Sequence, residues 1–186
     1  MVDGQPLAVE VCGKQRPVQL PSADQRDGAA LQGHDAHDRT AVAALTERGV
    51  PALGVDIAYA AVWLTRRQGG PALRRSVFDR VPGEGRWPTA LLMDGNVGIG
   101  GDPVQLLHRI RQLLAPSGRL IVEAHPDAHA DGRAPVRFQW PGSLAGAPFP
   151  WAEIGLHALR RDADRAGYIV DEVWSVGGRS FAVLRP

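Results

Sequence analysis

Two short segments of the sequence concentrate histidine and aspartate, side chains that transfer protons or bind metals near neutral pH. Their members are His34, Asp35, His37 and Asp38 in the first segment, and His125, Asp127, His129 and Asp131 in the second. An unperturbed imidazole titrates near pH ~6.5, and a neighbouring carboxylate raises that value and orients the ring. A histidine in such a pair suits general acid–base catalysis. We therefore predict that His34, His37 and His125 are catalytic.

The same two segments also permit a metal site. A His-x-x-His spacing beside carboxylates provides ligands that suit zinc, iron or manganese. On this hypothesis the metal ligands are His34, His37, His125 and His129. Histidines and aspartates in polar loops are often simply solvated, so a role as surface residues stays open as the alternative.

The elements around these segments predict a doubly wound α/β sheet. Apolar runs that fit buried strands alternate with helical stretches, at 52–56, 60–67, 73–78, 89–94, 103–114 and 118–123. Successive βα steps predict a parallel sheet covered on both faces, and ligands bind such a sheet at the carboxyl ends of its strands. Asp94 ends the 89–94 strand, so we expect it to lie with both His/Asp segments in one pocket and to be catalytic.

The two ends of the chain carry different patterns. Apolar and polar residues alternate at 7–11 and at 16–20, on either side of Gly13-Lys14, and this pattern predicts a hairpin. Residues 21–30 read as a linker, so we expect a single domain over 1–186, with a hairpin and linker at 1–30 and a Rossmann-like core at 31–186. A helix at 39–48 would start at Asp38 as its cap. Near the other end we expect a strand at 136–140, a helix at 152–166, and a hairpin of strands 168–176 and 180–184.

Composition narrows the classes of partner. The 186 residues carry a formal net charge of +1, and the basic residues are dispersed, which does not favour a nucleic-acid partner. Cys12 is the single cysteine, and no apolar run reaches the ~18 residues that would favour a membrane span. No secretory signal pattern is evident, so we expect a cytoplasmic protein with a small-molecule substrate and no membrane partner. Oligomeric state is not predicted by these features.

Three stretches resemble a known family: 48–57 (RGVPALGVDI), 73–79 (LRRSVFD) and 94–103 (DGNVGIGGDP). They are similar to small actinobacterial class I S-adenosylmethionine (SAM)-dependent methyltransferases, as are shorter matches at 113–120, 149–151 and 177–179. The resemblance implies a seven-stranded, mostly parallel sheet with a C-terminal antiparallel hairpin. It also implies that Asp56 binds the ribose of SAM, that Asp79 lies near the adenine, and that Asp94 faces the methyl donor and the substrate.

This sequence departs from the family's pattern at the glycine-rich cofactor loop. Counting back from Asp56 places its G-x-G-x-G motif on residues 35–39 (DAHDR), where no glycine remains. Side chains there would fill the space of the cofactor, and the carboxylates of Asp35 and Asp38 would oppose that of SAM. SAM binding is therefore expected to be weak or absent, and a divalent metal is a possible alternative cofactor.

Three functions follow from these observations. The first is an enzyme on a methyltransferase fold that has lost methyl transfer and modifies a small molecule by acid–base or metal-assisted cyclisation, elimination or hydrolysis. The second is a genuine SAM-dependent methyltransferase with an atypical cofactor loop. The third is a non-catalytic binding or partner subunit, because a fold can outlive its activity.

Overall fold

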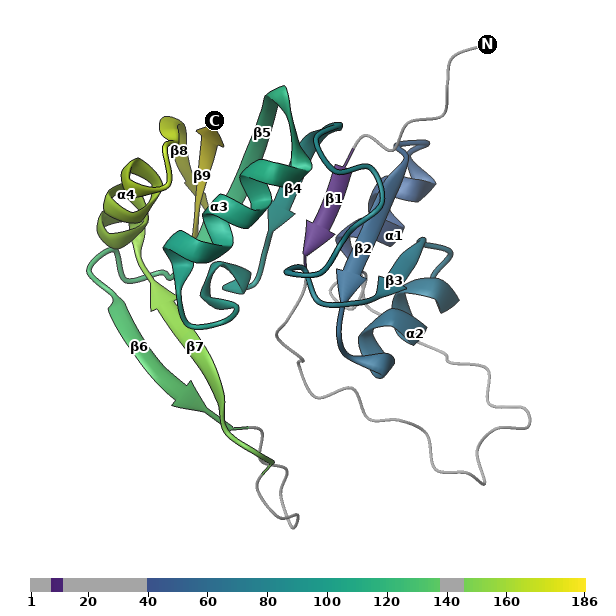
Figure 1. The fold of residues 1–186 in the computed structure, drawn as a ribbon, viewed down its shortest axis with the longest axis horizontal. Helices are drawn as coiled ribbons and strands as arrows, with labels where there is room; N and C mark the ends of the chain where they lie inside the picture. Colours follow the sequence, from purple (N-terminus) through teal and green to yellow (C-terminus); the bar gives the residue numbers. More distant parts are fainter. Residues whose placement is uncertain (1–7, 12–39, 138–145) are drawn as a thin grey trace.

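The computed structural model describes residues 8–11, 40–137 and 146–186, and they form a seven-stranded α/β sheet with an additional two-stranded sheet (Figure 1). In spatial order the seven strands are β3 (Ala72–Arg74), β2 (Ala52–Asp56), β1 (Ala8–Val11), β4 (Trp87–Leu92), β5 (Leu114–Ala124), β9 (Arg179–Arg185) and β8 (Ile169–Val176). The first five strands run parallel, and β9 is antiparallel to both β5 and β8. The predicted doubly wound, Rossmann-like sheet with a C-terminal hairpin is confirmed.

The N-terminal hairpin prediction is wrong. Instead of pairing with 16–20, Ala8–Val11 forms β1 in the middle of the sheet, parallel to β2 on one side and β4 on the other. Because both faces of a parallel sheet are covered, all four residues of β1 are buried, including Glu10. The predicted second strand of the hairpin, 16–20, lies outside the described residues.

Within the described residues, four α-helices cover the sheet: α1 (Ala41–Glu47), α2 (Tyr59–Arg67), α3 (Pro103–Leu113) and α4 (Leu156–Arg165). Helices α1 and α2 pack against β1, β2 and β3, whereas α3 and α4 lie side by side over β4, β5, β8 and β9 (Figure 1). The N-cap of α1 is Thr40, whose hydroxyl accepts a hydrogen bond from the Ala43 N–H, so the prediction of Asp38 as the cap was wrong. Asp102 caps α3, and the helix begins at Pro103, where the predicted 103–114 helix was expected to begin.

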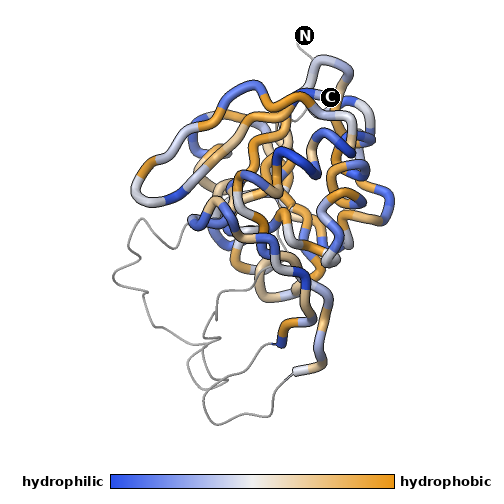
Figure 2. The backbone as a smooth tube through the Cα atoms, turned by 90° about the vertical axis from the view of Figure 1, so that its left-hand side faces the viewer, coloured by the Kyte–Doolittle hydropathy of each residue, from blue (hydrophilic) through white to orange (hydrophobic). Residues whose placement is uncertain are grey.

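The apolar core lies between the central strands and the α3–α4 layer. Fully buried side chains come from both, among them Leu92 on β4, Leu106 and Ile110 on α3, Leu120 on β5 and Leu184 on β9. Figure 2 shows hydrophobic residues concentrated in the middle of the molecule, whereas hydrophilic and hydrophobic residues alternate along the helices. Burial of these side chains is the main stabilisation that holds the strand ends in register.

Strand ends differ from their predicted positions for local reasons. The strand predicted at 89–94 ends at Leu92, and Asp94 has a φ of 54°, a left-handed value that cannot continue a strand. The strand predicted at 73–78 ends at Arg74, and the chain then turns, with the Asp79 N–H donating to the Ser76 carbonyl at 3.1 Å.

A two-stranded antiparallel sheet follows β5. It consists of β6 (Asp131–Val136) and β7 (Phe149–Ile154), and it projects away from the main sheet at the lower left of Figure 1. The strand that we predicted at 136–140 therefore begins earlier, and part of that range lies outside the described residues. The helix predicted from residue 152 begins only at Leu156, because 149–154 are paired as a strand.

Candidate functional site

Four carboxylates stand at the carboxyl ends of four neighbouring strands. Glu10 is on β1, Asp56 ends β2, Asp94 follows β4 by two residues, and Glu123 is near the end of β5. Because these strands are parallel, their carboxyl ends meet at the same edge of the sheet, which we call the carboxylate edge. His125 follows β5, so it lies at the same edge of the sheet as Asp56 and Asp94.

Glu10 is a buried acid of this edge with a strongly raised pKa. Its side chain is buried, and it accepts a hydrogen bond from the backbone N–H of Val42 at 3.1 Å. Burial, followed by repulsion from the carboxylates of Asp94 and Asp56, raises the pKa of Glu10 to about 7, and the Val42 hydrogen bond only partly opposes that rise. Glu10 therefore changes charge near neutral pH.

Asp56 is buried at the point where β2 turns into α2. Its Oδ1 accepts a hydrogen bond from the Ala58 N–H at 2.7 Å, which fixes the carboxylate at the edge. The residues beside this turn are apolar and exposed: Ile57 is 68% exposed and Tyr59 is 63% exposed. A fixed carboxylate next to exposed apolar side chains suits a ligand with both hydroxyl groups and a flat apolar part.

Asp94 is held by a contact with β5 and by the β8–β9 hairpin. Its N–H donates to Glu123 Oε2 at 2.7 Å, and its own carboxylate lies 3.1 Å from Arg179 Nη2. Arg179 also donates from Nε to Glu123 Oε1 at 2.7 Å, so one guanidinium joins two carboxylates of the edge. These carboxylates raise the pKa of Arg179, chiefly through the Glu123 hydrogen bonds. The Asp94 side chain itself is 73% exposed, the most open acid in this arrangement.

Asp79 lies in the turn after β3. Its side chain is exposed, and its backbone carbonyl accepts a hydrogen bond from Arg109 Nη2 at 2.6 Å. Arg109 comes from α3 and also donates from Nε to the Val77 carbonyl at 2.8 Å. The side chain of Arg109 therefore holds this turn against α3. The predicted role of Asp79 beside an adenine stays a prediction.

The histidines of the second segment help to shape the loop between β5 and β6. His125 Nδ1 accepts a hydrogen bond from the Asp127 N–H at 3.1 Å, and Asp127 in turn accepts one from the His129 N–H at 2.9 Å. The ring of His129 meets that of His157 edge-on, with 4.4 Å between centroids. Within residues 8–11, 40–137 and 146–186 no three His, Cys, Asp or Glu side chains are grouped to hold a metal ion. His34 and His37 lie outside these residues, and the catalytic and metal-binding roles of all four histidines stay predictions.

The position assigned to the glycine-rich loop is wrong. That loop directly follows the first strand of the sheet, and the first strand is β1, which ends at Val11. The residues after it in the sequence are Cys12 and Gly13, not 35–39. The absence of glycine at 35–39 is therefore no evidence against a cofactor. The missed signal was a short apolar strand with an acid, Glu10, directly before Cys12-Gly13.

No protein-family model matches the sequence, and no curated protein matches it. Among solved structures, the chain is similar to a SAM-dependent methyltransferase from Bacteroides fragilis in complex with S-adenosyl-L-homocysteine, with a TM-score of 0.63 and 23% identity over 76% of this chain and 65% of that one. It is also similar to the 1,6-didemethyltoxoflavin-N1-methyltransferase of Burkholderia thailandensis, with a TM-score of 0.59 and 18% identity over 98% of this chain and 72% of that one. A methyltransferase from Streptomyces caelestis aligns with a TM-score of 0.57 and 15% identity over 76% of each chain.

These likenesses establish the fold, which is the Rossmann-like fold of class I SAM-dependent methyltransferases. The chain spans 65% of the length of the Bacteroides fragilis protein. No helix in the part of the chain that the structure describes combines the length and the apolarity needed to cross a membrane.

Proposed function

We propose that this chain is a SAM-dependent methyltransferase that acts on a small molecule and holds its cofactor at the carboxylate edge. The observation that carries the proposal is Asp56, a buried, hydrogen-bonded carboxylate at the end of β2 and next to exposed Ile57. The structural neighbour from Burkholderia thailandensis is described with both its small-molecule substrate and S-adenosylhomocysteine bound, which supports the same pairing of ligands here.

The donor set of the edge fits SAM. SAM bears ribose hydroxyls, an ammonium group and a sulfonium cation, and carboxylates accept hydrogen bonds from the first two and attract the positive charges. When bound, SAM supplies an electrophilic methyl group. On this proposal Asp56 accepts from the ribose, and the carboxylates of Glu10 and Asp94 create the negative potential around the positive groups.

This function replaces the one in which methyl transfer has been lost. That hypothesis depended on the missing glycines at 35–39, and these residues do not directly follow β1. A genuine SAM-dependent methyltransferase with an atypical cofactor loop was the alternative from the sequence, and the fold of the neighbours supports a methyltransferase.

Calorimetric titration of the full chain with SAM and with S-adenosylhomocysteine tests the proposal. We expect a dissociation constant in the low micromolar range, about −8 kcal/mol. Asp56→Asn removes the charge that accepts from the ribose and should weaken binding about 10-fold or more, equivalent to ~1.4 kcal/mol.

The matched control is Asp164→Asn, the same change at an exposed position of α4, and it should leave the affinity unchanged. Absence of heat with either ligand at concentrations near 1 mM (about −4 kcal/mol) would rule the proposal out.

A further inference from the structure

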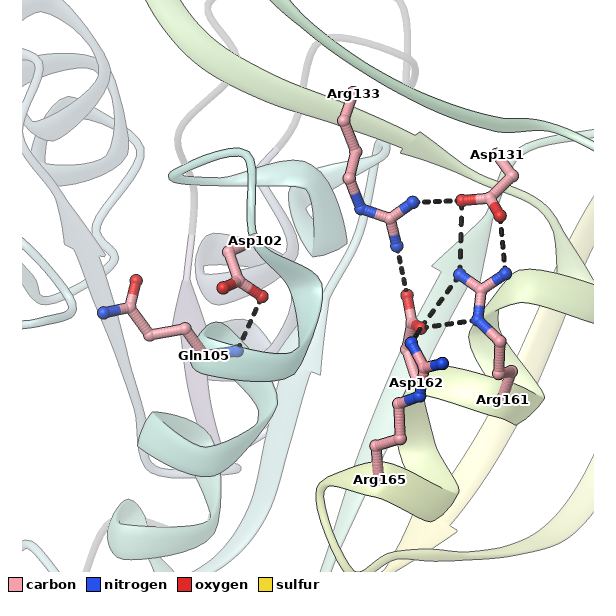
Figure 3. Close-up of polar contacts among 7 residues, drawn as sticks. All are labelled: Asp102, Gln105, Asp131, Arg133, Arg161, Asp162 and Arg165. Carbon is pink, nitrogen blue, oxygen red and sulfur yellow. Dashed lines mark hydrogen bonds and ion pairs between the residues drawn. The ribbon is translucent and has the colours of Figure 1, made fainter.

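A polar cavity of about 590 Å³ lies between the start of α3, β6 and α4, and none of its lining residues is one of the carboxylates of the carboxylate edge. Its lining residues are Gly101, Asp102, Val104, Asp131, Arg133, Arg161 and Arg165. Figure 3 shows Asp102 at the start of α3 and the three arginine side chains on the side of β6 and α4. Three guanidinium groups that converge on one cavity provide the donors that bind oxyanions.

Two carboxylates, Asp131 and Asp162, hold two of these arginines by ion pairs. Asp162 on α4 has no exposed side-chain surface, and it binds Arg133 Nη2 at 2.7 Å and Arg161 Nη2 at 2.9 Å. Asp131 on β6 binds the same two arginines, with Arg161 Nη1 at 2.6 Å. These hydrogen bonds keep the pKa of Asp131 low, at about 2, so it stays ionised. Both guanidinium groups are thereby fixed in orientation at the cavity wall.

Arg165 is the third arginine of the cavity, and its ion pairing is much weaker than that of Arg133 and Arg161. Its only contact with a described carboxylate is with Asp162 at 3.7 Å, and its side chain is 61% exposed. Arg165 and Asp162 are three residues apart on the same helix, so this contact cannot fasten β6 to α4. Arg133 and Arg161 already make that connection. Arg165 therefore places a third positive charge at the cavity that the fold does not require.

The formal charges around the cavity cancel when Asp102 is counted, and Arg165 is the cation that the carboxylates engage least. Arg133, Arg161 and Arg165 supply three positive charges, whereas Asp131 and Asp162 supply two negative ones. The remaining acid, Asp102, lies on the facing wall, where its Oδ1 accepts a hydrogen bond from the Gln105 N–H at 3.1 Å. The positive end of the α3 dipole offsets the charge of Asp102 at that position.

We propose that this cavity is a binding site for the phosphate or carboxylate group of a small molecule, with Arg165 as the arginine that meets the anion. Arg161 and Arg133 form the rest of the cationic wall, and Asp162 positions their guanidinium groups. The site stands independently of methyl transfer, because none of its residues belongs to the carboxylate edge.

Titration of the full chain, followed by ¹H–¹⁵N NMR at constant ionic strength in sodium chloride, tests the site in two arms. One arm uses inorganic phosphate and the other uses succinate, and the tighter ligand shows whether the site prefers a phosphate or a carboxylate. We expect saturable shifts at the amides of Gly101, Val104 and Arg133, with a dissociation constant of about 1–10 mM for the better ligand.

Two variants on α4 separate binding from structure. Arg165→Gln should weaken the better ligand about fivefold or more, because a neutral amide cannot form a charge-assisted bond. Arg160→Gln makes the same change at an exposed neighbour on α4 that does not line the cavity, and it should bind as the wild type does. Shifts that never saturate, or equal affinities for these two variants, would overturn the proposal.

Discussion

The carboxylate of Glu10 accepts a hydrogen bond from the Val42 N–H at 3.1 Å and so joins the end of β1 to the first turn of α1, across 32 residues of sequence. The two residues belong to elements that pack together at the carboxylate edge, with Asp56 and Asp94 near enough to raise the pKa of Glu10. This acid is therefore both a structural connection and a group that titrates near neutral pH.

The stability of the protein should fall between about pH 4.5 and pH 7 because of Glu10. Its pKa rises from 4.5 to about 7 on folding, so in this range the folded protein binds more protons than the unfolded chain. The contribution is fully present below pH 4.5 and is lost as the pH rises through 7, and its size is about 3 kcal/mol. Glu10→Gln removes the titration and keeps an acceptor for Val42, so it should stabilise the protein at pH 8 relative to the wild type.

Urea denaturation at pH 5 and pH 8 measures this difference. Glu172→Gln, at an exposed position of β8, serves as the matched control and should show the pH dependence of the wild type. If Glu10→Gln and the wild type lose stability equally between the two pH values, then Glu10 is not the titrating group.

Arg179 should contribute more to stability than Arg185, although both are on β9 and both form ion pairs. Arg179 binds Glu123, whose side chain is only 12% exposed, whereas Arg185 pairs with Asp171 at the surface. We expect Arg179→Ala to lower the free energy of unfolding by about 1–3 kcal/mol, because it removes a charged hydrogen-bond partner of a nearly buried carboxylate. Arg185→Ala should cost about 0–1 kcal/mol. Chemical denaturation of the two variants decides the matter, and equal losses would contradict the assignment.

Gly98 should not tolerate a side chain. A Cβ at this position would lie 1.9 Å from the carbonyl oxygen of Ala152 on β7, a backbone atom that cannot move aside cheaply. Gly98→Ala should therefore lower the melting temperature by about 10 °C or more, as expected for overpacking of a buried site. Gly132→Ala is the control, since a Cβ there meets nothing within 4 Å. A melting temperature for Gly98→Ala within about 2 °C of that control would show that the 96–98 turn and β7 are not in tight contact.

Local sequence signals predicted the elements that have strong local signatures. The strand at 52–56 has the predicted bounds, and α3 begins at Pro103 as predicted, because an apolar run that ends in Asp56 and an Asp-Pro cap are short-range features. The position of β1 depends instead on pairing with β2 and β4, which are distant in sequence. Alternation in 7–11 fits an edge hairpin equally well, so the sequence could not distinguish the two.

Only the part of the candidate site that has local sequence signals was predicted. Asp56 and Asp94 follow recognisable strands, and the structure brings them to one edge. Glu10 was missed because its strand was misassigned, and Arg179 because a hairpin turn carries no signal that its side chain reaches β5. The arginine-lined cavity depends on the packing of β6 against α4, which no local pattern reveals.

The predicted role of the histidines in catalysis can be tested separately. Alanine substitution of His34, His37 or His125 should lower turnover of the true substrate about 10²-fold or more if that residue transfers a proton in the reaction. Melting temperatures close to the wild type are needed to separate this from unfolding, especially for His125, whose Nδ1 accepts a bond from Asp127. Full turnover by all three variants would show that these histidines are surface residues.

Among the acidic residues of α4, Asp162 should cause the largest loss of stability when its charge is removed. Its carboxylate is fully buried and is the common partner of Arg133, Arg161 and Arg165. Asp162→Asn leaves those cations without the charge that holds them together. We expect a loss of about 2–4 kcal/mol, near the lower end for a broken buried pair because the arginines are partly exposed.

The same change at Asp164, exposed and two residues further along the helix, should cost less than about 0.5 kcal/mol. Amide hydrogen exchange locates the effect, because Arg133 is on β6 and Arg161 is on α4. In Asp162→Asn the amides of β6 and β7 should exchange faster, whereas those of β1 and β4 should keep their protection relative to global unfolding. Uniformly faster exchange across the main sheet would mean that Asp162 supports the whole core and does not chiefly fasten β6 to α4.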